Sequence, residues 1–226
     1  MSSKITTLIN KYDNCEILRD EVAAILAIEV ANQKVLAVAE GERADDYSFD
    51  VYTERSSPWE LIEDENGKII RQSPLVNVYL ESENADGSML TTIDSMAYDC
   101  NITIDCLAAK VHKVVGRLRY AGDELAARDV QRIARLIRNI LMSPLYYKLN
   151  MPEVVHYRRI ESITMFQPNF GDRPAQSVVG ARINLKASIT ENVPQAEFEF
   201  LELVQGRITR AEDGLLLAEL QFEDET

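Results

Sequence analysis

Four arginines with helical spacing form the most distinctive charged pattern in the sequence. They are Arg128, Arg132, Arg135 and Arg138, and all four lie within GDELAARDVQRIARLIRNILMSP, residues 122–144. Because an α-helix makes one turn in about 3.6 residues, this spacing places the four guanidinium groups along one side of a helix, and we expect no acid at the centre of the row. Such a row is either a solvated outer face or a surface covered by an acidic neighbour or a phosphate backbone.

The other residues that could do chemistry do not form a catalytic pattern. His112 and His156 are separated by the whole arginine-rich segment, so we expect surface or packing roles for both. Asp99 and Asp105 would be about 20 Å apart on one extended strand, too far to flank a single bond. The usual nucleotide-binding, serine hydrolase and zinc protease motifs do not occur. The sequence therefore predicts no enzyme activity, no cofactor and no metal site.

The three cysteines and the acidic runs are interpreted in the same way. Cys100 and Cys106 lie on one predicted strand, again about 20 Å apart, whereas a disulfide needs Cα atoms within about 7 Å. Cys15 is distant in sequence and no CxxC pair occurs, so we expect reduced, structural cysteines. The acidic runs 63–65 and 223–225 lack the alternating ligand order of a calcium loop and are read as solvated charge.

Composition narrows the class of protein. The chain has 226 residues, 46% of them hydrophobic and 27% charged, which is enough for one globular domain with a real core. With 37 acids against 24 bases the formal net charge is −13, so any contact with DNA must be local. No signal peptide and no run of 18 uncharged apolar residues is seen, and we expect a soluble, intracellular product without membrane association.

Two helices must position these residues. The arginine segment predicts a long central helix with Asp123 as its N-cap and Pro144 as its stop. One apolar stripe is expected to face the core, formed by Ala126, Val130, Ile133, Ile137, Ile140 and Leu141. A second helix is predicted from Cys15 to Glu40, capped by Asn14 and ended by Gly41. Its apolar face is expected to contain Leu18, Val22, Ile25 and either Ile28 or Glu29.

Alternating segments predict a largely antiparallel sheet. Residues 75–82 form one strand, and Tyr98 to Ala108 form the clearest one, with one buried face and one wet face. Residues 158–166 and 178–190 are expected to pair across the loop between them. Residues 195–226 contain two further β-like runs, interpreted as a C-terminal hairpin or extended arm.

Residues 42–73 break this regular pattern and are expected to form an arm or a long ordered loop, with an edge strand in YSFDVYTE. Trp59, the only tryptophan, either anchors this segment to its own domain or contacts a partner. The predicted fold class is α+β: one domain, residues 1–226, with a mainly antiparallel sheet packed against a long central helix and an N-terminal helix, an arm at 42–73 and a C-terminal hairpin at 195–226.

The order of these elements resembles that of the tail-terminator and neck proteins of tailed bacteriophages. The resemblance rests on the leading helix, the PLVNVY strand, the long alternating strand, the arginine-bearing helix ending in RNILM, and the later phrases SITMFQP and VGARINLKASI. It covers roughly Cys15 to Thr190 without residues 42–73. The arm and the C-terminal hairpin exceed the compact family pattern.

This resemblance implies a structural virion protein, assembled in the host cytoplasm, that forms a hexameric ring on the head-proximal end of the tail tube. The implied partners are further copies of the chain, the tail tube or sheath protein, and the head-to-tail connector, with DNA only passing through the ring. Arg128, Arg132, Arg135, Arg138 and Trp59 are then candidate interface residues. Neutralising Arg132 and Arg135 together is expected to weaken assembly or docking without unfolding the monomer.

Other roles remain open at this stage. The chain could be a different neck, collar or sheath-contacting protein, or a monomeric adaptor. A hydrolase or another small-molecule enzyme, with a site between the arm and the sheet near Trp59, is a further alternative. It predicts a deep pocket lined by carboxylates with raised pKa values.

Overall fold

The computed structural model of this protein describes residues 5, 8–64, 66, 68–85, 95–115, 118–170, 173–174, 178–192, 203–209 and 216–223. The chain forms two compact units. The body comprises Asn10–Val193, and the terminal unit comprises Met1–Ile9 with Pro194–Thr226. In the terminal unit, β10 (Leu203–Thr209) pairs antiparallel with β11 (Leu216–Glu223).

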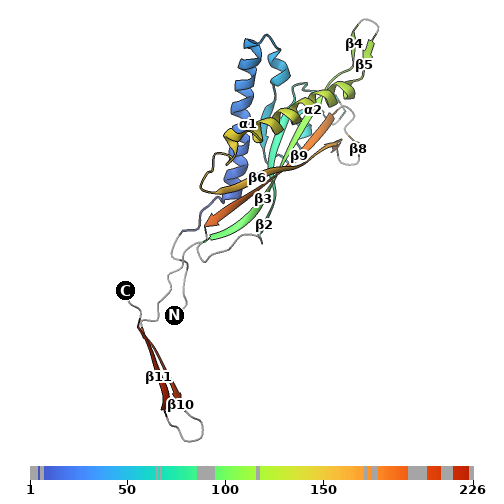
Figure 1. The fold of residues 1–226 in the computed structure, drawn as a ribbon. Coiled ribbons are helices and arrows are strands. Elements are labelled where there is room, and N and C mark those ends of the chain that lie inside the picture. Colours follow the sequence, from blue (N-terminus) through green and yellow to red (C-terminus); the bar gives the residue numbers. More distant parts are fainter. Residues whose placement is uncertain are drawn as a thin grey trace. The chain divides into compact units, whose positions relative to one another are not determined.

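The body is built on a five-stranded sheet with the strand order β1-β2-β3-β9-β6 (Figure 1). The strands are β1 (Asp50–Thr53), β2 (Leu75–Ala85), β3 (Ser95–Ala109), β9 (Val178–Asn192) and β6 (Val155–Phe166). Only the pairing of β1 with β2 is parallel. The predicted pairing of residues 158–166 with 178–190 is confirmed by β6 and β9, and β1 is the edge strand expected within residues 42–73.

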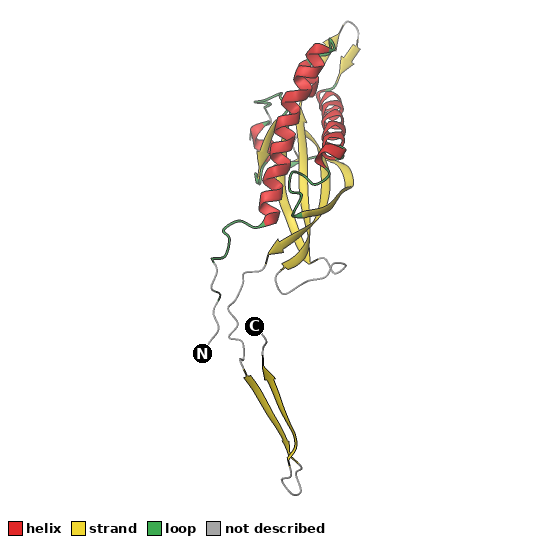
Figure 2. Ribbon diagram, turned by 60° about the vertical axis from the view of Figure 1, so that its left-hand side comes forward, coloured by secondary structure: helices red, strands yellow, loops and turns green. Residues whose placement is uncertain are grey.

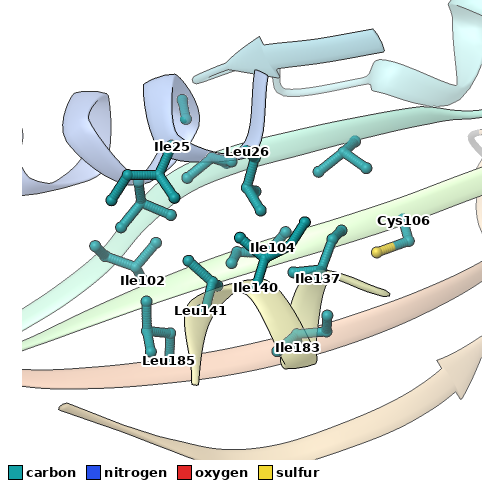
Figure 3. Close-up of a cluster of buried hydrophobic side chains, with 14 of the residues drawn as sticks. Ile25, Leu26, Ile102, Ile104, Cys106, Ile137, Ile140, Leu141, Ile183 and Leu185 are labelled. Carbon is teal, nitrogen blue, oxygen red and sulfur yellow. The ribbon is translucent and has the colours of Figure 1, made fainter. Parts of the chain in front are cut away.

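Two helices, α1 (Asn14–Ala39) and α2 (Gly122–Leu141), cover one face of this sheet (Figure 2). Their apolar side chains meet those of β2, β3 and β9 in one core, in which Ile25, Ile104 and Ile137 are fully buried (Figure 3). Burying an isoleucine or leucine side chain of this kind contributes about 1.5–3 kcal/mol. The predicted α+β class, with a mainly antiparallel sheet against two helices, is confirmed.

The central helix keeps its predicted stripe but begins differently. All six residues of the stripe are buried: Ala126, Val130, Ile133, Ile137, Ile140 and Leu141. The N-cap prediction was wrong, because the cap is Ala121, and Asp123 lies in the first turn, where its carboxylate accepts from the Glu124 N–H. Gly122 is needed at this start, since a Cβ there would lie 2.1 Å from the Lys110 carbonyl oxygen. Pro144 opens the short 3₁₀ turn η3 (Pro144–Tyr146) after the helix has ended.

The N-terminal helix also corrects two expectations. Its cap is Asp13, whose carboxylate accepts from the Glu16 N–H at 2.7 Å, and Asn14 instead donates to the Thr190 carbonyl oxygen. Ile28 is 61% exposed, so the buried face continues through Leu26 and Val30. Gly41 follows the helix with φ +77°, the left-handed conformation that ends helices and suits glycine.

The face of the sheet that the helices do not cover is not uniformly exposed to solvent. Of the predicted wet residues of β3, Asp99 and Asn101 are half-buried, but Thr103 and Asp105 are buried. Arg182 covers Asp105, which also lines a small cleft with the 3₁₀ turn η2 (Pro58–Leu61), and the segment of η2 continues into a second small apolar cluster. That cluster consists of Ile62, Leu75, Leu107, Ala109 and Val178, with Trp59 and Phe166 packed against it. The 3₁₀ turn η1 (Ala44–Tyr47) packs instead against α1 and α2.

Two pairs of short strands complete the sheets of the described body. β4 (Lys113–Val115) pairs with β5 (Leu118–Tyr120), and β7 (Asn169–Phe170) pairs with β8 (Arg173–Pro174). β4 and β5 follow the end of β3 and lead into α2, so they place the first turn of α2 beside Lys110 and His112.

Candidate functional site

A polar cleft of about 650 Å³ lies where η1, the end of β3 and the N-terminal half of α2 come together. Its basic lining residues are Arg43, Lys110, His112, Lys113, Arg128 and Arg132, and its acidic ones are Asp45, Asp46 and Asp129. Two of the four arginines predicted as interface residues, Arg128 and Arg132, therefore line this cationic cleft. Arg135 and Arg138 continue along α2 as exposed side chains and do not line it.

Arg132 is held from two sides. One of its guanidinium nitrogens lies 2.9 Å from the Asp46 carboxylate of η1 and 3.6 Å from the Asp129 carboxylate one turn earlier in α2. The expectation that no acid lies at the centre of the row was therefore wrong. The Arg132 side chain is 41% exposed, so each ion pair contributes at most about 1 kcal/mol to stability.

The remaining ion pairs of the cationic cleft connect its structural elements and so determine its shape. Lys110 lies 3.1 Å from Asp129, which joins the end of β3 to α2. Arg128 pairs with Glu124 at 2.5 Å and lies over the ring of Tyr120, with 5.8 Å between the guanidinium carbon and the ring centroid. These contacts connect the segments that form the walls of the cleft.

The balance of the cationic cleft is positive although the whole chain is strongly acidic. Its lining contains five lysines and arginines against three aspartates. Within the described residues, Arg43 and Lys113 are exposed and form no ion pair, and the same is true of Arg135 and Arg138 on α2. Guanidinium and ammonium groups in such a setting bind carboxylates or phosphates.

Trp59 lies on the other face of the sheet, in a smaller cleft of about 290 Å³ that also contains Tyr79, Asp105 and Arg182. It is half-buried and packs on the small apolar cluster, so its own domain accounts for much of its surface. Arg182 donates to both oxygens of the buried Asp105 carboxylate at 2.8 and 2.9 Å. Burial, followed by the negative charge of Asp105, raises the pKa of Tyr79 to about 12.

This smaller cleft differs from the pocket that the hydrolase alternative predicts. Its deepest carboxylate, Asp105, is 2% exposed and is neutralised by Arg182, whose own pKa is raised by hydrogen bonding to Asp105. A carboxylate in a bidentate ion pair is a poor general base because its lone pairs are already occupied. The arrangement is that of a structural ion pair beside an anchoring tryptophan.

The outer side of α1 forms a third candidate surface, which the prediction of the buried face of this helix did not reveal. Several apolar residues on its outer side are exposed, and among them are Ala24, Ile28, Ala31, Val35 and Val38. They recur at alternating steps of four and three residues, the spacing of a coiled-coil seam, and we call them the α1 seam. By length and composition α1 could also cross a membrane, although its opposite side is packed on the sheet.

Within the part of the chain that the structure describes, one group of residues able to hold a metal ion lies beside the start of α1. The ligand atoms of Asp13, Cys15 and Glu83 are all within 4.8 Å of one another. Sequence reasoning missed this group because its members come from distant segments.

Comparison with known proteins adds no family assignment: no model of a protein family matches the chain, and no curated protein matches its sequence.

Proposed function

We propose that this protein is a structural virion protein, a tail terminator that forms a hexameric ring at the head-proximal end of a phage tail tube and provides the docking surface for the head connector. Two observations support the proposal. The order of the elements resembles that of tail terminators, and the two units of the chain carry charges of opposite sign at the surfaces that would meet. The cationic cleft of the body has an excess of basic residues. Residues 194–226 of the terminal unit contain nine acidic and two basic residues.

The terminal unit makes the subunit contact in this proposal. A two-stranded β-ribbon is by itself at best marginally stable in water, so docking on a further surface would stabilise β10 and β11. The ribbon of one copy docks on the cationic cleft of the next, with carboxylates facing Arg43, Lys113, Arg128 and Arg132. Because donor and acceptor surfaces differ, the contact is head-to-tail, and a head-to-tail contact closes into a ring when the rotation between copies fits.

The α1 seam binds a protein other than a further copy of this chain. Exposed apolar patches usually mark interaction sites, and the heptad spacing of this one fits an apolar face of another helix. Pairing of α1 with α1 of a second copy would impose a two-fold axis, which a head-to-tail ring does not contain. The seam is therefore assigned to a helix of the connector that docks on the completed ring.

Electron microscopy of the purified protein, alone and mixed with tail tubes, tests the proposal. We expect rings of six subunits with a central channel, and we expect these rings at one end of the tubes. Inactivation of the gene in its phage should give filled heads without tails and free tails of irregular length. Intact virions from such a phage, or binding along the side of the tube as a collar or sheath protein would bind, would contradict the terminator assignment.

A further inference from the structure

Three side chains with metal-binding atoms meet where α1 begins, and a fourth lies next to them. Asp13 caps the helix, Cys15 lies in its first turn, and Glu83 comes from β2; their ligand atoms lie within 4.8 Å of one another. Cys100 of β3 is a second buried thiol, directly opposite Glu83 in the pairing of β2 with β3. We call these four residues the thiol–carboxylate cluster. It is not merely acidic, because half of its members are cysteines.

A β-bulge brings Glu83 into this cluster. Upstream of it Leu80 pairs with Ile102, and downstream Glu83 pairs with Cys100, with the register shifting between Leu80 and Ser82. A one-residue shift exchanges the two faces of a strand. Glu83 is thereby placed directly opposite Cys100, and residues in that relation have Cβ atoms about 4.5–5.5 Å apart.

Burial divides the cluster into a closed side and an open side. Cys15 is 2% exposed and Cys100 is fully buried, so the two thiols are shielded from water. Asp13 is half-buried and Glu83 is exposed, which leaves an entry path for an ion. One oxygen of Asp13 accepts from the Glu16 N–H, so Asp13 would bind an ion through its other oxygen.

Several carboxylates lie around the start of α1. They belong to Asp13, Glu83 and Glu191, and the Glu191 carboxylate accepts from the Asn14 N–H at 2.8 Å. A bound cation would offset their negative charge and stabilise a thiolate beside them.

We propose that the thiol–carboxylate cluster binds one divalent transition-metal ion of the zinc class, with Cys15, Cys100, Asp13 and Glu83 as ligands. Thiolate ligands select zinc-like ions over calcium and magnesium, which prefer oxygen, and four protein ligands are the usual number of a structural zinc site. Binding releases the two thiol protons to solvent. The ion joins the first turn of α1 to β2 and β3, so its role is structural.

The test uses the full-length protein, purified free of metal. Titration with Zn²⁺ against a chromophoric chelator should give about one equivalent per chain, and Co²⁺ should give the near-ultraviolet absorption band of cobalt bound to thiolate. Cys15→Ser and Cys100→Ser should each lower the affinity by at least about tenfold and weaken the band. Cys106→Ser is the matched control, because Cys106 is also a fully buried cysteine of β3.

A further variant guards against misfolding. Glu83 is exposed, so Glu83→Gln should keep the far-ultraviolet circular dichroism of the wild type and still lose affinity by about tenfold. No saturable Zn²⁺ binding, a Co²⁺ complex without the thiolate band, or an equal loss in Cys106→Ser would each overturn the proposal.

Discussion

The two ends of α1 present opposite electrostatic problems. Near its C-terminus, the cationic cleft combines basic and acidic residues, and Asp46 and Asp129 already compensate part of the charge of Arg132. Near its N-terminus, the thiol–carboxylate cluster gathers only groups that become negative, and the pKa of Glu83 is raised by desolvation and then by the Asp13 carboxylate. A cleft balanced in this way tolerates solvent, and in the proposed ring it would bind the acidic ribbon of a neighbouring copy. A cluster of like charges is stable only when it stays protonated or binds a cation.

The largest expected effect is that of metal on the thiol–carboxylate cluster. Zn²⁺ at about one hundred times its dissociation constant should stabilise the protein by about 2.7 kcal/mol, which for a chain of this size raises Tm by roughly 5–10 °C. Differential scanning calorimetry with Zn²⁺ or with a chelator measures the change. Cys106→Ser should retain the shift and Cys15→Ser should lose it; a shift that survives in Cys15→Ser would place the ion elsewhere.

The next effect separates the four arginines of α2. The double variant Arg128→Glu with Arg132→Glu should raise the dissociation constant of the ring at least about tenfold, because each reversed charge removes a partner for a carboxylate of the neighbouring copy. Arg135→Glu with Arg138→Glu makes the same change in net charge on the same helix but outside the cationic cleft, and it should change the constant less than about twofold.

Sedimentation velocity over a range of concentrations gives both dissociation constants, and circular dichroism shows whether each variant is folded. Equal weakening by the two double variants would mean that net charge alone drives association. If neither variant has an effect, the arginine row is simply a solvated face, and the cleft has no part in assembly.

The sequence predicted the helices and sheet well because their signals are local. The stripe of α2 follows from a spacing of three and four residues, and each of its members, such as Val130 and Ile137, is buried. Capping was predicted less well, since Asp13 and Asn14 are both good caps and only the contacts with Thr190 and Glu191 favour Asp13 by engaging Asn14.

The two charged sites were predicted only in part, because tertiary contacts create them. Arg128 and Arg132 could be chosen from the sequence, but the partner Asp46 is 86 residues away from Arg132. The thiol–carboxylate cluster depends on a bulge in β2 that the pattern LVNVYLES does not reveal. Strict alternation would put Glu83 on the opposite face from Leu80, away from Cys15.

A smaller effect is expected from the acid that compensates the cationic cleft. Asp46→Asn removes the 2.9 Å ion pair with Arg132, and since both side chains are more than a third exposed, the free energy of unfolding should fall by less than about 1 kcal/mol. The freed guanidinium should at the same time bind the acidic ribbon more tightly. Urea denaturation and sedimentation on the same sample measure both changes, and a loss of association would show that Asp46 itself contacts the neighbour.

The smallest effect tests the sign of the charge at the thiol–carboxylate cluster. The folded-state pKa of Glu83 is raised, so the folded protein binds more protons than the unfolded chain, and stability should increase as the pH falls toward the ordinary glutamate value of about 4.3. Glu83→Gln should weaken this dependence, and Glu191, whose pKa is also raised by burial, should retain part of it. The substitution should stabilise the metal-free protein by less than about 1 kcal/mol, because Glu83 is largely exposed.

The same substitution should have the opposite effect once metal is present. Glu83→Gln removes a ligand, so the Zn²⁺-loaded variant should be less stable than the loaded wild type, although the metal-free variant is more stable than the metal-free wild type. Urea denaturation of the wild type and the variant, each with and without Zn²⁺, at neutral and mildly acidic pH measures this reversal of the order of stability. If Glu83→Gln changed stability in the same direction with and without metal, Glu83 would act only as an acidic surface residue, and the ion, if bound, would depend on the other three side chains.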